Sequence, residues 1–438
     1  MSYHVVLCRT TKIHEINDFK NFFRWCKIPT SESYYCKGGT PMAISRKIEK
    51  YISSASWIRR MFEEGEKLRK IYGSEKVYDF TLGNPDIEPP AAFKEALKYL
   101  ALNPIPGMHR YMSNAGYEET RLAVAEVLAD QTGLPFDQNH IVMTCGAGAA
   151  MNVVLKSILD QDDEVIILSP YFVEYKFYID NHGGIAKAVP TTPEFMLDME
   201  AIGSALTPRT KAIIVNSPNN PTGVVYDDVS LRKLGKLLED MESKSGNQVY
   251  VISDEPYAKI IYDGLTLPSI FKCVKNSIVV TSHSKDLALP GERIGYAAVS
   301  PQIDNSALLI EALIFCNRTL GFVNAPALMQ RLVTGLQHES MDIYGYQEKR
   351  DILYDNLTTL GFEMVKPQGA FYLFPKSPLP DDVKFVMAAQ KYNILLVPGS
   401  GFGAPGHFRI AYCMDKQIIL NSLPAFKALA AELGMTKK

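Results

Sequence analysis

The 438-residue chain lacks long apolar runs, paired cysteines and an excess of charge of either sign, and each absence excludes a class of protein. No run reaches the roughly 18 apolar residues that a transmembrane helix requires, so we expect no membrane span. The formal net charge of −2 argues against nucleic acid or an anionic membrane surface as a partner. The seven cysteines are scattered and form no CxxC pair, which favours free thiols in a reducing cytoplasm and no metal site.

Residues 1–41 differ from the rest of the chain. They hold three of the seven cysteines and one of the two tryptophans, and they show no sustained helical or strand periodicity. They also lack the basic start, apolar stretch and small-residue cleavage site of a secretory signal, so we expect a cytoplasmic protein. The sequence thus predicts an atypical N-terminal extension, followed from Met42 by a strongly helical pattern.

Two hypotheses account for this extension. Lys37-Gly38-Gly39 can be encoded by AAAGGAGGN, a purine-rich ribosome-binding sequence a short distance before the Met42 codon. On the first hypothesis Met42 is the native start, and residues 1–41 are translated upstream sequence. On the second, they form a genuine N-terminal arm. The intact mass of the protein expressed from its own gene distinguishes the two.

From about residue 139 the chain alternates short β-branched runs with helical stretches such as Val229–Glu242. Most of the runs are four to six residues long and apolar on both faces, which suits strands buried between helical layers in a mostly parallel sheet. The alternation predicts a doubly wound α/β fold. The seven predicted strands are His140–Thr144, Glu164–Leu168, Ala186–Val189, Ala212–Val215, Val249–Ile252, Ser277–Thr281 and Ile294–Val299.

After Pro301 the pattern becomes mostly helical to about residue 360. A mixed α+β segment follows, with strand-like runs at Phe371–Phe374 and Ile394–Val397 and a helical tail at Gln417–Leu433. No internal repeat or low-complexity linker interrupts this organisation.

Polar or glycine-rich clusters follow four of the predicted strands. Because ligands of open α/β sheets bind outside the carboxyl ends of the strands, we expect these clusters to meet at one edge. The clusters are TCGAGA (Thr144–Ala149), NSPNNPTG (Asn216–Gly223), SDEPY (Ser253–Tyr257), and SHSK (Ser282–Lys285) together with PGERIGY (Pro290–Tyr296).

The first two clusters can supply hydrogen-bond donors to a ligand. Small residues at 145–148 let the backbone approach a ligand, and the free N–H groups of the helix that follows favour an anion. A tight turn without a ligand explains such glycines about as well. In the second cluster two prolines and a glycine fix an exposed turn on which the amide of Asn220 can donate to a ligand oxygen. For the NPxG portion alone, a plain turn remains the alternative.

The last two clusters carry charge. Asp254 at the end of a buried strand is costly unless its charge is paired, and a protonated ring nitrogen would pair it; a helix N-cap is the alternative. Desolvation beside the sheet would lower the pKa of Lys285 and free its amine to attack a carbonyl. Ser282, Ser284 and Arg293 can supply donors to a phosphate. A lone lysine is usually a solvated surface charge, but that interpretation leaves the other clusters unexplained.

Together these residues describe one ligand. It has a carbonyl for Lys285, a protonated aromatic nitrogen for Asp254, a phenolic oxygen for Asn220 and Tyr257, and a phosphate for the glycine turn, the serines and Arg293. Pyridoxal 5'-phosphate (PLP) has all four groups, and we expect it as the cofactor.

At these residues the sequence resembles the class I/II aminotransferases of the aspartate aminotransferase superfamily. The segments SPNNPTG, SDEPY and SHSKDLALPGERIGY occur in the family's order and spacing, and the resemblance runs from about Met42 to the C-terminus. It implies the type I PLP-dependent fold: a large domain (78–330) with a seven-stranded, mostly parallel sheet between helices, and a smaller α+β domain. The small domain would combine residues 42–77 and 331–438 and close over the substrate to exclude water.

The resemblance implies catalytic roles for Lys285, Asp254 and Tyr257. Lys285 matches the lysine that holds the cofactor as a Schiff base and later carries the proton between substrate and cofactor. Asp254 matches the aspartate that keeps the pyridine nitrogen protonated. Asn220 and Tyr257 match the pair that contacts the ring oxygen.

The remaining implied contacts belong to the cofactor. Ser282 and Arg293 match the phosphate-binding serine and arginine, and Ala147 and Gly148 fall where backbone amides hold the phosphate. Phe172 falls where an aromatic side chain stacks on the pyridine ring, although by itself it would be interpreted as a core residue.

The resemblance also implies substrate and subunit contacts. Arg409, in FRIAY, matches the arginine that binds the substrate α-carboxylate, with Asn220 and Gly83 close to it. Tyr111, in RYMSNAGY, matches a tyrosine that reaches the phosphate of the neighbouring subunit. We therefore expect a homodimer with shared active sites.

The implied reaction moves an amino group from an L-amino acid to a 2-oxo acid in two half-reactions, a ping-pong mechanism. One alternative is a C–S lyase or a side-chain-eliminating synthase on the same fold, which would release ammonia or a thiol without an oxo-acid acceptor. Another is a non-catalytic regulator that keeps the cofactor fold, but residues 1–41 supply no basic helix for a DNA-binding domain.

The identity of the substrate stays open. Some aspartate-specific relatives carry a lysine where this chain has Gly148, so aspartate is not expected by that route. Apolar and aromatic residues near Tyr171 and Phe371 would suit a bulky substrate, or they belong to the core.

Overall fold

A computed structural model describes residues 44–54 and 57–435 of the chain. The chain divides between residues 56 and 57 into two compact units, which we treat separately. The first contributes helix α2 (Arg46–Ser54), and the second holds every other element described below. In these described ranges no helix has the length and apolar character of a membrane span. The extension at 1–41 and the proposed start at Met42 lie outside the described residues.

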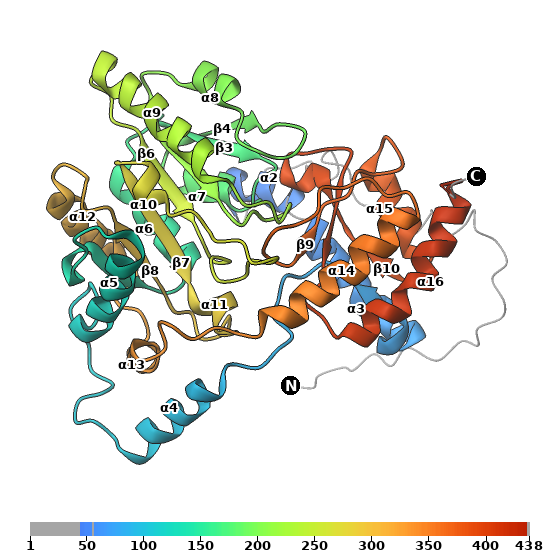
Figure 1. Ribbon diagram of the computed structural model, residues 1–438, viewed down its shortest axis with the longest axis horizontal. Coiled ribbons are helices and arrows are strands. Elements are labelled where there is room, and N and C mark those ends of the chain that lie inside the picture. The colour runs from blue at the N-terminus through green and yellow to red at the C-terminus, as the bar shows by residue number, and fades with distance from the viewer. Residues whose placement is uncertain (1–43, 55–56, 436–438) are drawn as a thin grey trace, which may run out of the picture. The chain divides into compact units, whose positions relative to one another are not determined.

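A seven-stranded sheet with the order β2-β8-β7-β6-β5-β3-β4 forms the centre of the second unit (Figure 1). Strand β8 runs opposite to the other six strands, so the predicted α/β fold with a mostly parallel seven-stranded sheet is confirmed. Each predicted strand overlaps an observed one. The strands are β2 (Ile141–Thr144), β3 (Glu164–Ser169), β4 (Ile185–Pro190), β5 (Thr210–Asn216), β6 (Tyr250–Asp254), β7 (Ser277–Ser282) and β8 (Gly295–Val299).

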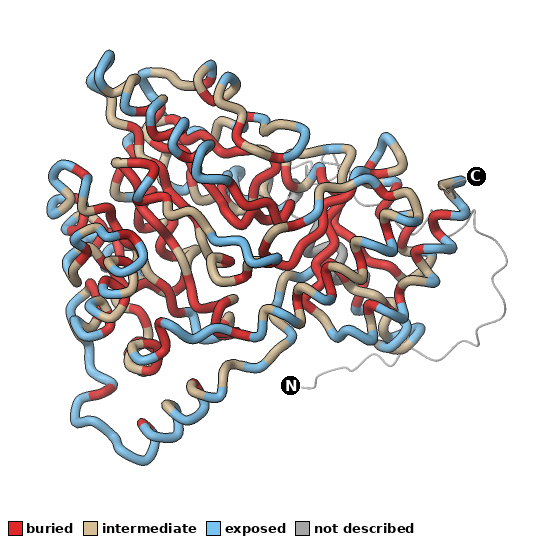
Figure 2. Tube along the Cα trace, viewed as in Figure 1, coloured by how far each residue is buried: buried red, intermediate tan, exposed pale blue. Residues whose placement is uncertain are grey.

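Helices cover both faces of the sheet, which explains why its strands are continuously apolar. On β5, Ile213 and Val215 join the core on one face, while Ala212 and Ile214 join the core on the other. Figure 2 shows the strands as a buried layer between more exposed helices. The first face packs against α4 (Ala91–Leu102), α5 (Glu118–Thr132), α8 (Met199–Ala205), α9 (Asp228–Ser245), α10 (Ile270–Cys273) and α13 (Ala327–Thr334), and the second against α6 (Ala147–Ile158), α7 (Tyr175–Asn181) and α12 (Ser306–Thr319).

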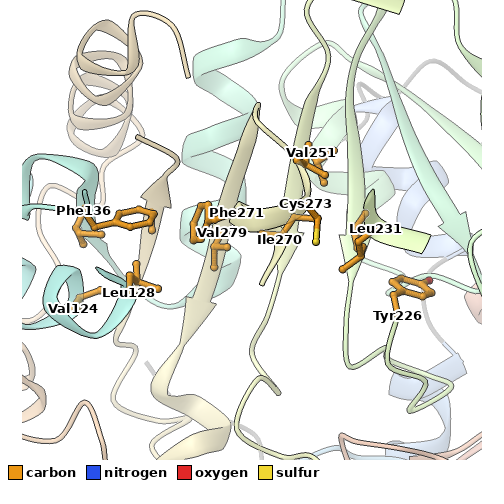
Figure 3. Close-up of a cluster of buried hydrophobic side chains, with 14 of the residues drawn as sticks. Val124, Leu128, Phe136, Tyr226, Leu231, Val251, Ile270, Phe271, Cys273 and Val279 are labelled. Atoms are coloured by element: carbon orange, nitrogen blue, oxygen red, sulfur yellow. The ribbon is translucent and has the colours of Figure 1, made fainter. Parts of the chain in front are cut away.

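The core on the first face joins side chains that are distant in sequence. Figure 3 shows Phe136 and Phe271 beside Val279 of β7, and the two phenyl rings meet edge to face with centroids 4.8 Å apart. Leu231 of α9 lies in the same cluster. The cluster therefore packs helices α5, α9 and α10 against this face of the sheet.

Strand β4 departs from the expectation. Most of the predicted strands were expected to be buried on both faces, but most residues of β4 are exposed or half-buried, and Ile185 keeps 44% of its surface exposed. The reason is its place at the edge of the sheet, where β3 is its single neighbour.

The C-terminal segment forms a separate apolar core beyond the sheet. The predicted strand Ile394–Val397 is interrupted at Leu396, because its first half pairs with β1 and its second half with β12. The predicted α+β pattern is otherwise observed, while the domain boundaries expected at residues 77 and 330 stay a prediction. The elements are α3 (Trp57–Tyr72), β1 (Tyr78–Asp79), α14 (Ile343–Thr359), β9 (Tyr372–Leu373), α15 (Asp382–Gln390), β10 (Ile394–Leu395), β11 (Val397–Pro398), β12 (Phe408–Ala411) and α16 (Lys416–Glu432).

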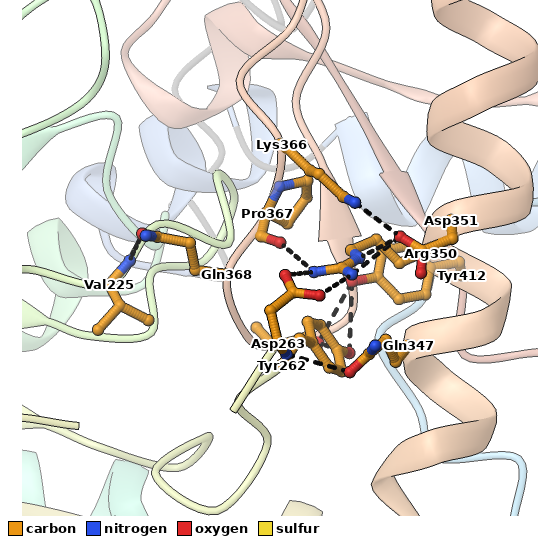
Figure 4. A network of polar contacts seen from close by, with 11 residues as sticks. Val225, Tyr262, Asp263, Gln347, Arg350, Asp351, Lys366, Pro367, Gln368 and Tyr412 are labelled. Carbon is orange, nitrogen blue, oxygen red and sulfur yellow. Dashed lines mark hydrogen bonds and ion pairs between the residues drawn. The ribbon is translucent and has the colours of Figure 1, made fainter. Parts of the chain in front are cut away.

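A buried arginine on α14 ties this segment to the loop after β6 (Figure 4). The fully buried guanidinium of Arg350 donates to both carboxylate oxygens of Asp263, at 2.7 and 2.8 Å, and to the carbonyl of Pro367 at 2.9 Å. It also lies over the ring of Tyr262, 4.8 Å from its centre. A buried cation is tolerated when it is paired and hydrogen-bonded in this way.

Candidate active site

A cavity of about 350 Å³ opens at the carboxyl ends of the parallel strands. This volume lies within the range of small-molecule sites. All four predicted clusters meet here, and because β8 runs antiparallel, its first residues lie at the same edge. The predicted site residues that line the cavity are Gly83, Ala147, Gly148, Phe172, Asn220, Asp254, Tyr257, Ser282, Lys285, Arg293 and Arg409.

Lys285 lies in the short helix α11 (His283–Asp286), directly after β7. Its Nζ donates to the carbonyl of Gly83 at 2.6 Å. Burial lowers the pKa of Lys285 to about 8, and Arg409 and Arg293 contribute in the same direction. With that pKa, roughly a tenth of the amines are neutral at pH 7, which makes this lysine a usable nucleophile.

Asp254 ends β6 and is nearly buried, with 8% of its surface exposed. Burial raises the pKa of Asp254 to about 6, and a hydrogen bond from the hydroxyl of Tyr175 opposes the rise. A cationic ring nitrogen placed against the carboxylate would stabilise its ionised form.

Asn220 is held in place by hydrogen bonds among the ends of β5 and β6. Its backbone N–H donates to the side-chain oxygen of Asn216 at 2.7 Å, and the Asn216 amide donates to the Asp254 carbonyl at 2.8 Å. In the same turn Asn219 accepts from the backbone and the hydroxyl of Thr222. The SPNNPTG segment is therefore a turn built by its own side chains, which leaves Asn220 facing the cavity.

Arg409 on β12 is 97% buried and reaches across from the C-terminal segment. Its Nη1 donates to Asn220 Oδ1 at 3.0 Å and its Nη2 donates to the carbonyl of Thr81 at 2.6 Å. Its Nε is buried and has no partner among the described residues. A fixed, buried guanidinium with an unused donor can bind a carboxylate.

The opposite end of the cavity suits an anion. Ala147 and Gly148 form the first turn of α6, where the backbone N–H groups lack helical partners. Arg293 lies beside this turn. Its guanidinium is so close to Gly146 that a Cβ atom added to this glycine would lie 3.1 Å from it. Ser282 is buried beside the same cavity.

Tyr257 and Gly83 both lie against Tyr372, a residue that the sequence analysis did not single out. The hydroxyl of Tyr257 lies 2.8 Å from the hydroxyl of Tyr372, and both line the cavity. A Cβ atom on Gly83 would come within 1.9 Å of the Tyr372 hydroxyl, so the close approach requires glycine.

Phe172 and Tyr111 occupy different surroundings. Phe172 is half-buried in the cavity wall and meets the ring of Tyr175 edge to face at 5.6 Å. Tyr111 does not line the cavity of this chain, and 88% of its surface is exposed.

The structure also adds cavity residues that the sequence analysis missed. Tyr175 begins α7 only three positions after Phe172, and that nearness in sequence could have identified it. Tyr372 was assigned only to a strand, and its contacts join residues far apart in the chain. The missed residues are Thr81, Leu82, Met151, Tyr175, Tyr178 and Tyr372.

Sequence comparison groups this chain with known enzymes. Residues 75–423 match the family described as aminotransferase class I and II. The chain is 34% identical over 355 residues to a probable aspartate/prephenate aminotransferase of Thermus aquaticus, covering 79% of this chain and 89% of that protein. It is 33% identical over 352 residues to the aspartate/prephenate aminotransferase of Thermus thermophilus, with the same coverage.

Solved structures give the same grouping. An amino transferase from Eubacterium rectale matches with a TM-score of 0.86 and 38% identity, over 89% of this chain and 99% of that chain. A double mutant of Thermus thermophilus aspartate aminotransferase matches with a TM-score of 0.79 and 30% identity, over 89% of this chain and all of that chain.

Proposed function

The chain belongs to the class I and II aminotransferases, and we propose that it transfers the amino group of an L-amino acid to a 2-oxo acid with PLP held by Lys285. One observation carries the proposal. A desolvated lysine amine, a buried carboxyl group and a buried arginine, supplied by Lys285, Asp254 and Arg409, face one cavity.

The residues of the cavity fit this cofactor. The pKa of Asp254 is raised by burial, so a protonated ring nitrogen would relieve the unfavourable charge. The N-terminus of α6, Ser282 and Arg293 offer donors to the phosphate. Phe172 offers an aromatic face to the ring, and Tyr257 and Asn220 offer donors to its oxygen.

When bound, PLP supplies a carbonyl that condenses with primary amines and a ring that accepts electrons from the substrate. Lys285 provides the amine that holds this carbonyl between turnovers. When it is not bound to the cofactor, the Lys285 amine would accept the proton that the substrate α-carbon loses. Its lowered pKa suits it to accept and return that proton near neutral pH.

Arg409 and Asp254 position the other charges. Arg409 binds the substrate α-carboxylate through its fixed guanidinium, with Asn220 and Gly83 beside it. Asp254 keeps the proton on the ring nitrogen. A second substrate, a 2-oxo acid, uses the same contacts in the reverse half-reaction, which gives ping-pong kinetics.

The proposed assembly is a cytoplasmic homodimer in which Tyr111 reaches the phosphate site of the partner subunit. The exposure of Tyr111 and of two apolar side chains on α4, Tyr99 and Leu102, supports the dimer. Four free cysteines in the described part of the chain support a reducing compartment.

The test is a half-reaction screen. Purified protein is loaded with PLP, and each amino acid is added without an oxo acid while the visible absorbance of the lysine-bound cofactor is followed. Loss of the band with one or a few donors is expected, together with formation of the matching oxo acid. Lys285→Ala should give no such band, whereas Lys272→Ala, an exposed control on α10, should behave like the wild type.

Two results would count against the proposal. A persistent band with release of ammonia or a thiol would indicate the lyase alternative. Absence of the band in the wild-type protein would remove the role of Lys285.

A further inference from the structure

Tyr257 and Tyr372 join their hydroxyl groups inside the cavity, although 115 positions separate them. Their oxygen atoms lie 2.8 Å apart, and both side chains are buried, with 4% and 2% of their surface exposed. The rings meet edge to face, with centroids 5.7 Å apart and an interplanar angle of 86°. A single hydrogen bond therefore connects two rigidly held phenols.

The proposed function decides which phenol donates. A phenol has one proton, and Tyr257 needs it for the cofactor's ring oxygen. Tyr257 must then accept the shared hydrogen bond, and Tyr372 must donate it. Among the residues that the structure describes, the Tyr372 hydroxyl makes no other hydrogen bond, so its proton is free for this purpose.

The surroundings keep the Tyr372 hydroxyl protonated, as the donor role requires. Burial raises the pKa of Tyr372 to about 12, with Arg409 opposing the rise, so the hydroxyl keeps its proton at neutral pH. The Arg409 guanidinium lies 4.7 Å from the centre of the Tyr372 ring, and its positive charge makes the phenol a better donor. The backbone at Gly83 closes the other side of the hydroxyl.

We propose that Tyr372 is a positioning residue that directs the proton of Tyr257 toward the cofactor's ring oxygen. The inference rests on the proposed function. A hydrogen bond received by Tyr257 polarises its own O–H group and makes it a stronger donor. A stronger donor at the ring oxygen withdraws negative charge from the ring. The nitrogen that joins Lys285 to the cofactor then binds its proton less tightly.

The charged and titratable groups that face the pair belong to several elements. Asp254 ends β6, Lys285 lies on α11, Arg409 lies on β12 and Cys413 follows that strand. A change from tyrosine to phenylalanine leaves all of these groups and the aromatic ring in place. An effect of this change therefore reports the hydroxyl alone.

The experiment titrates the visible band of the PLP-loaded protein with pH. In Tyr372→Phe the midpoint should rise by roughly 0.5 pH unit, because one polarising hydrogen bond is lost. Tyr257→Phe should raise it further. The double variant should equal Tyr257→Phe alone, because Tyr372 acts through Tyr257. Tyr226→Phe, a buried tyrosine outside the cavity, is the control and should leave the midpoint unchanged.

The outcomes separate the inference from the proposed function. An unchanged midpoint in Tyr372→Phe, or shifts that add in the double variant, would overturn the positioning role while the enzyme stays an aminotransferase. A wild-type protein that forms no visible band with PLP would remove the proposed function, and the inference with it.

Discussion

Asp254 is a group whose charge opposes the stability of the cofactor-free protein. Its pKa rises from 3.8 to about 6 on folding, with burial as the main cause and the hydrogen bond from Tyr175 opposing it. Because the folded state holds the proton more tightly, this carboxyl group contributes no cost well below pH 4. The cost grows between about pH 4 and pH 6, from the unfolded to the folded pKa, and levels off above pH 7 at about 3 kcal/mol at most.

Asp254→Asn should therefore stabilise the cofactor-free protein at pH 8 by up to about 3 kcal/mol, and by progressively less toward pH 5. The amide can still accept the hydrogen bond from Tyr175. Urea unfolding at several pH values checks this, and a variant that is less stable than the wild type at pH 8 would contradict it. The same variant should bind PLP weakly, because the partner of the ring nitrogen is lost.

The element scale shows why α14 tolerates a fully buried guanidinium. Two carboxylates pair with the charge of Arg350. Asp351 is its neighbour on α14, and Asp263 lies in the loop after β6. The hydrogen bonds from Arg350 hold the pKa of Asp263 below its usual range. Removal of the arginine would leave the Pro367 carbonyl without its donor.

Arg350→Met should lower the free energy of unfolding by about 2 kcal/mol, because the buried Pro367 carbonyl loses its donor and the partly exposed Asp263 loses its partner. The matched control is Arg232→Met, which breaks an exposed ion pair with Asp228 on α9 and should lower the free energy of unfolding far less, because solvent screens the pair. Urea midpoints of the two variants give the comparison. Equal losses of unfolding free energy in the two variants would mean that the burial of Arg350 contributes nothing to stability.

The order of apolar and polar residues within a segment predicted the helices and strands well wherever the segment's own composition reflects how far it is buried. The seven strands could be found because most of them are apolar on both faces, and the four clusters were placed correctly at the carboxyl edge. The exposure of β4 depends on the order of strands, and the break at Leu396 depends on which strand each half pairs with. Neither property is present in a short stretch of sequence.

The candidate site could be predicted only where a motif carried it. Eleven of the predicted residues line the cavity, whereas Tyr372 and Tyr175 were missed. Their hydrogen bonds join positions separated by 115 and 79 residues, to Tyr257 and Asp254 respectively. Such contacts follow from the packing of distant elements and have no local periodicity.

At the scale of the whole molecule, the proposed dimer makes each active site the product of two chains. In each proposed site one subunit supplies Lys285 and the other supplies Tyr111. Lys285→Ala and Tyr111→Ala therefore remove residues that come to one site from different subunits. In a mixed dimer one site keeps both intact residues. The two inactive or weakened variants should therefore complement each other.

Refolding or subunit exchange of equal amounts of the two variants should restore about a quarter of wild-type activity, since half of the dimers are mixed and each has one intact site. Each variant alone, treated in the same way, is the control. Activity no greater than the sum of the separate variants, in a mixture shown to exchange subunits, would argue that Tyr111 does not cross between chains.

The contact between Gly83 and Tyr372 has an evolutionary consequence. A side chain at position 83 and a phenolic hydroxyl at position 372 would occupy the same space, 1.9 Å apart. A larger residue at 83 therefore requires that the Tyr372 side chain move or be replaced by a smaller one, because Cζ of its ring would also lie only 2.8 Å away. Under the positioning role proposed above, a change at Tyr372 would already weaken the hydrogen bond to the cofactor's ring oxygen. The residues at positions 83 and 372 are therefore expected to change together.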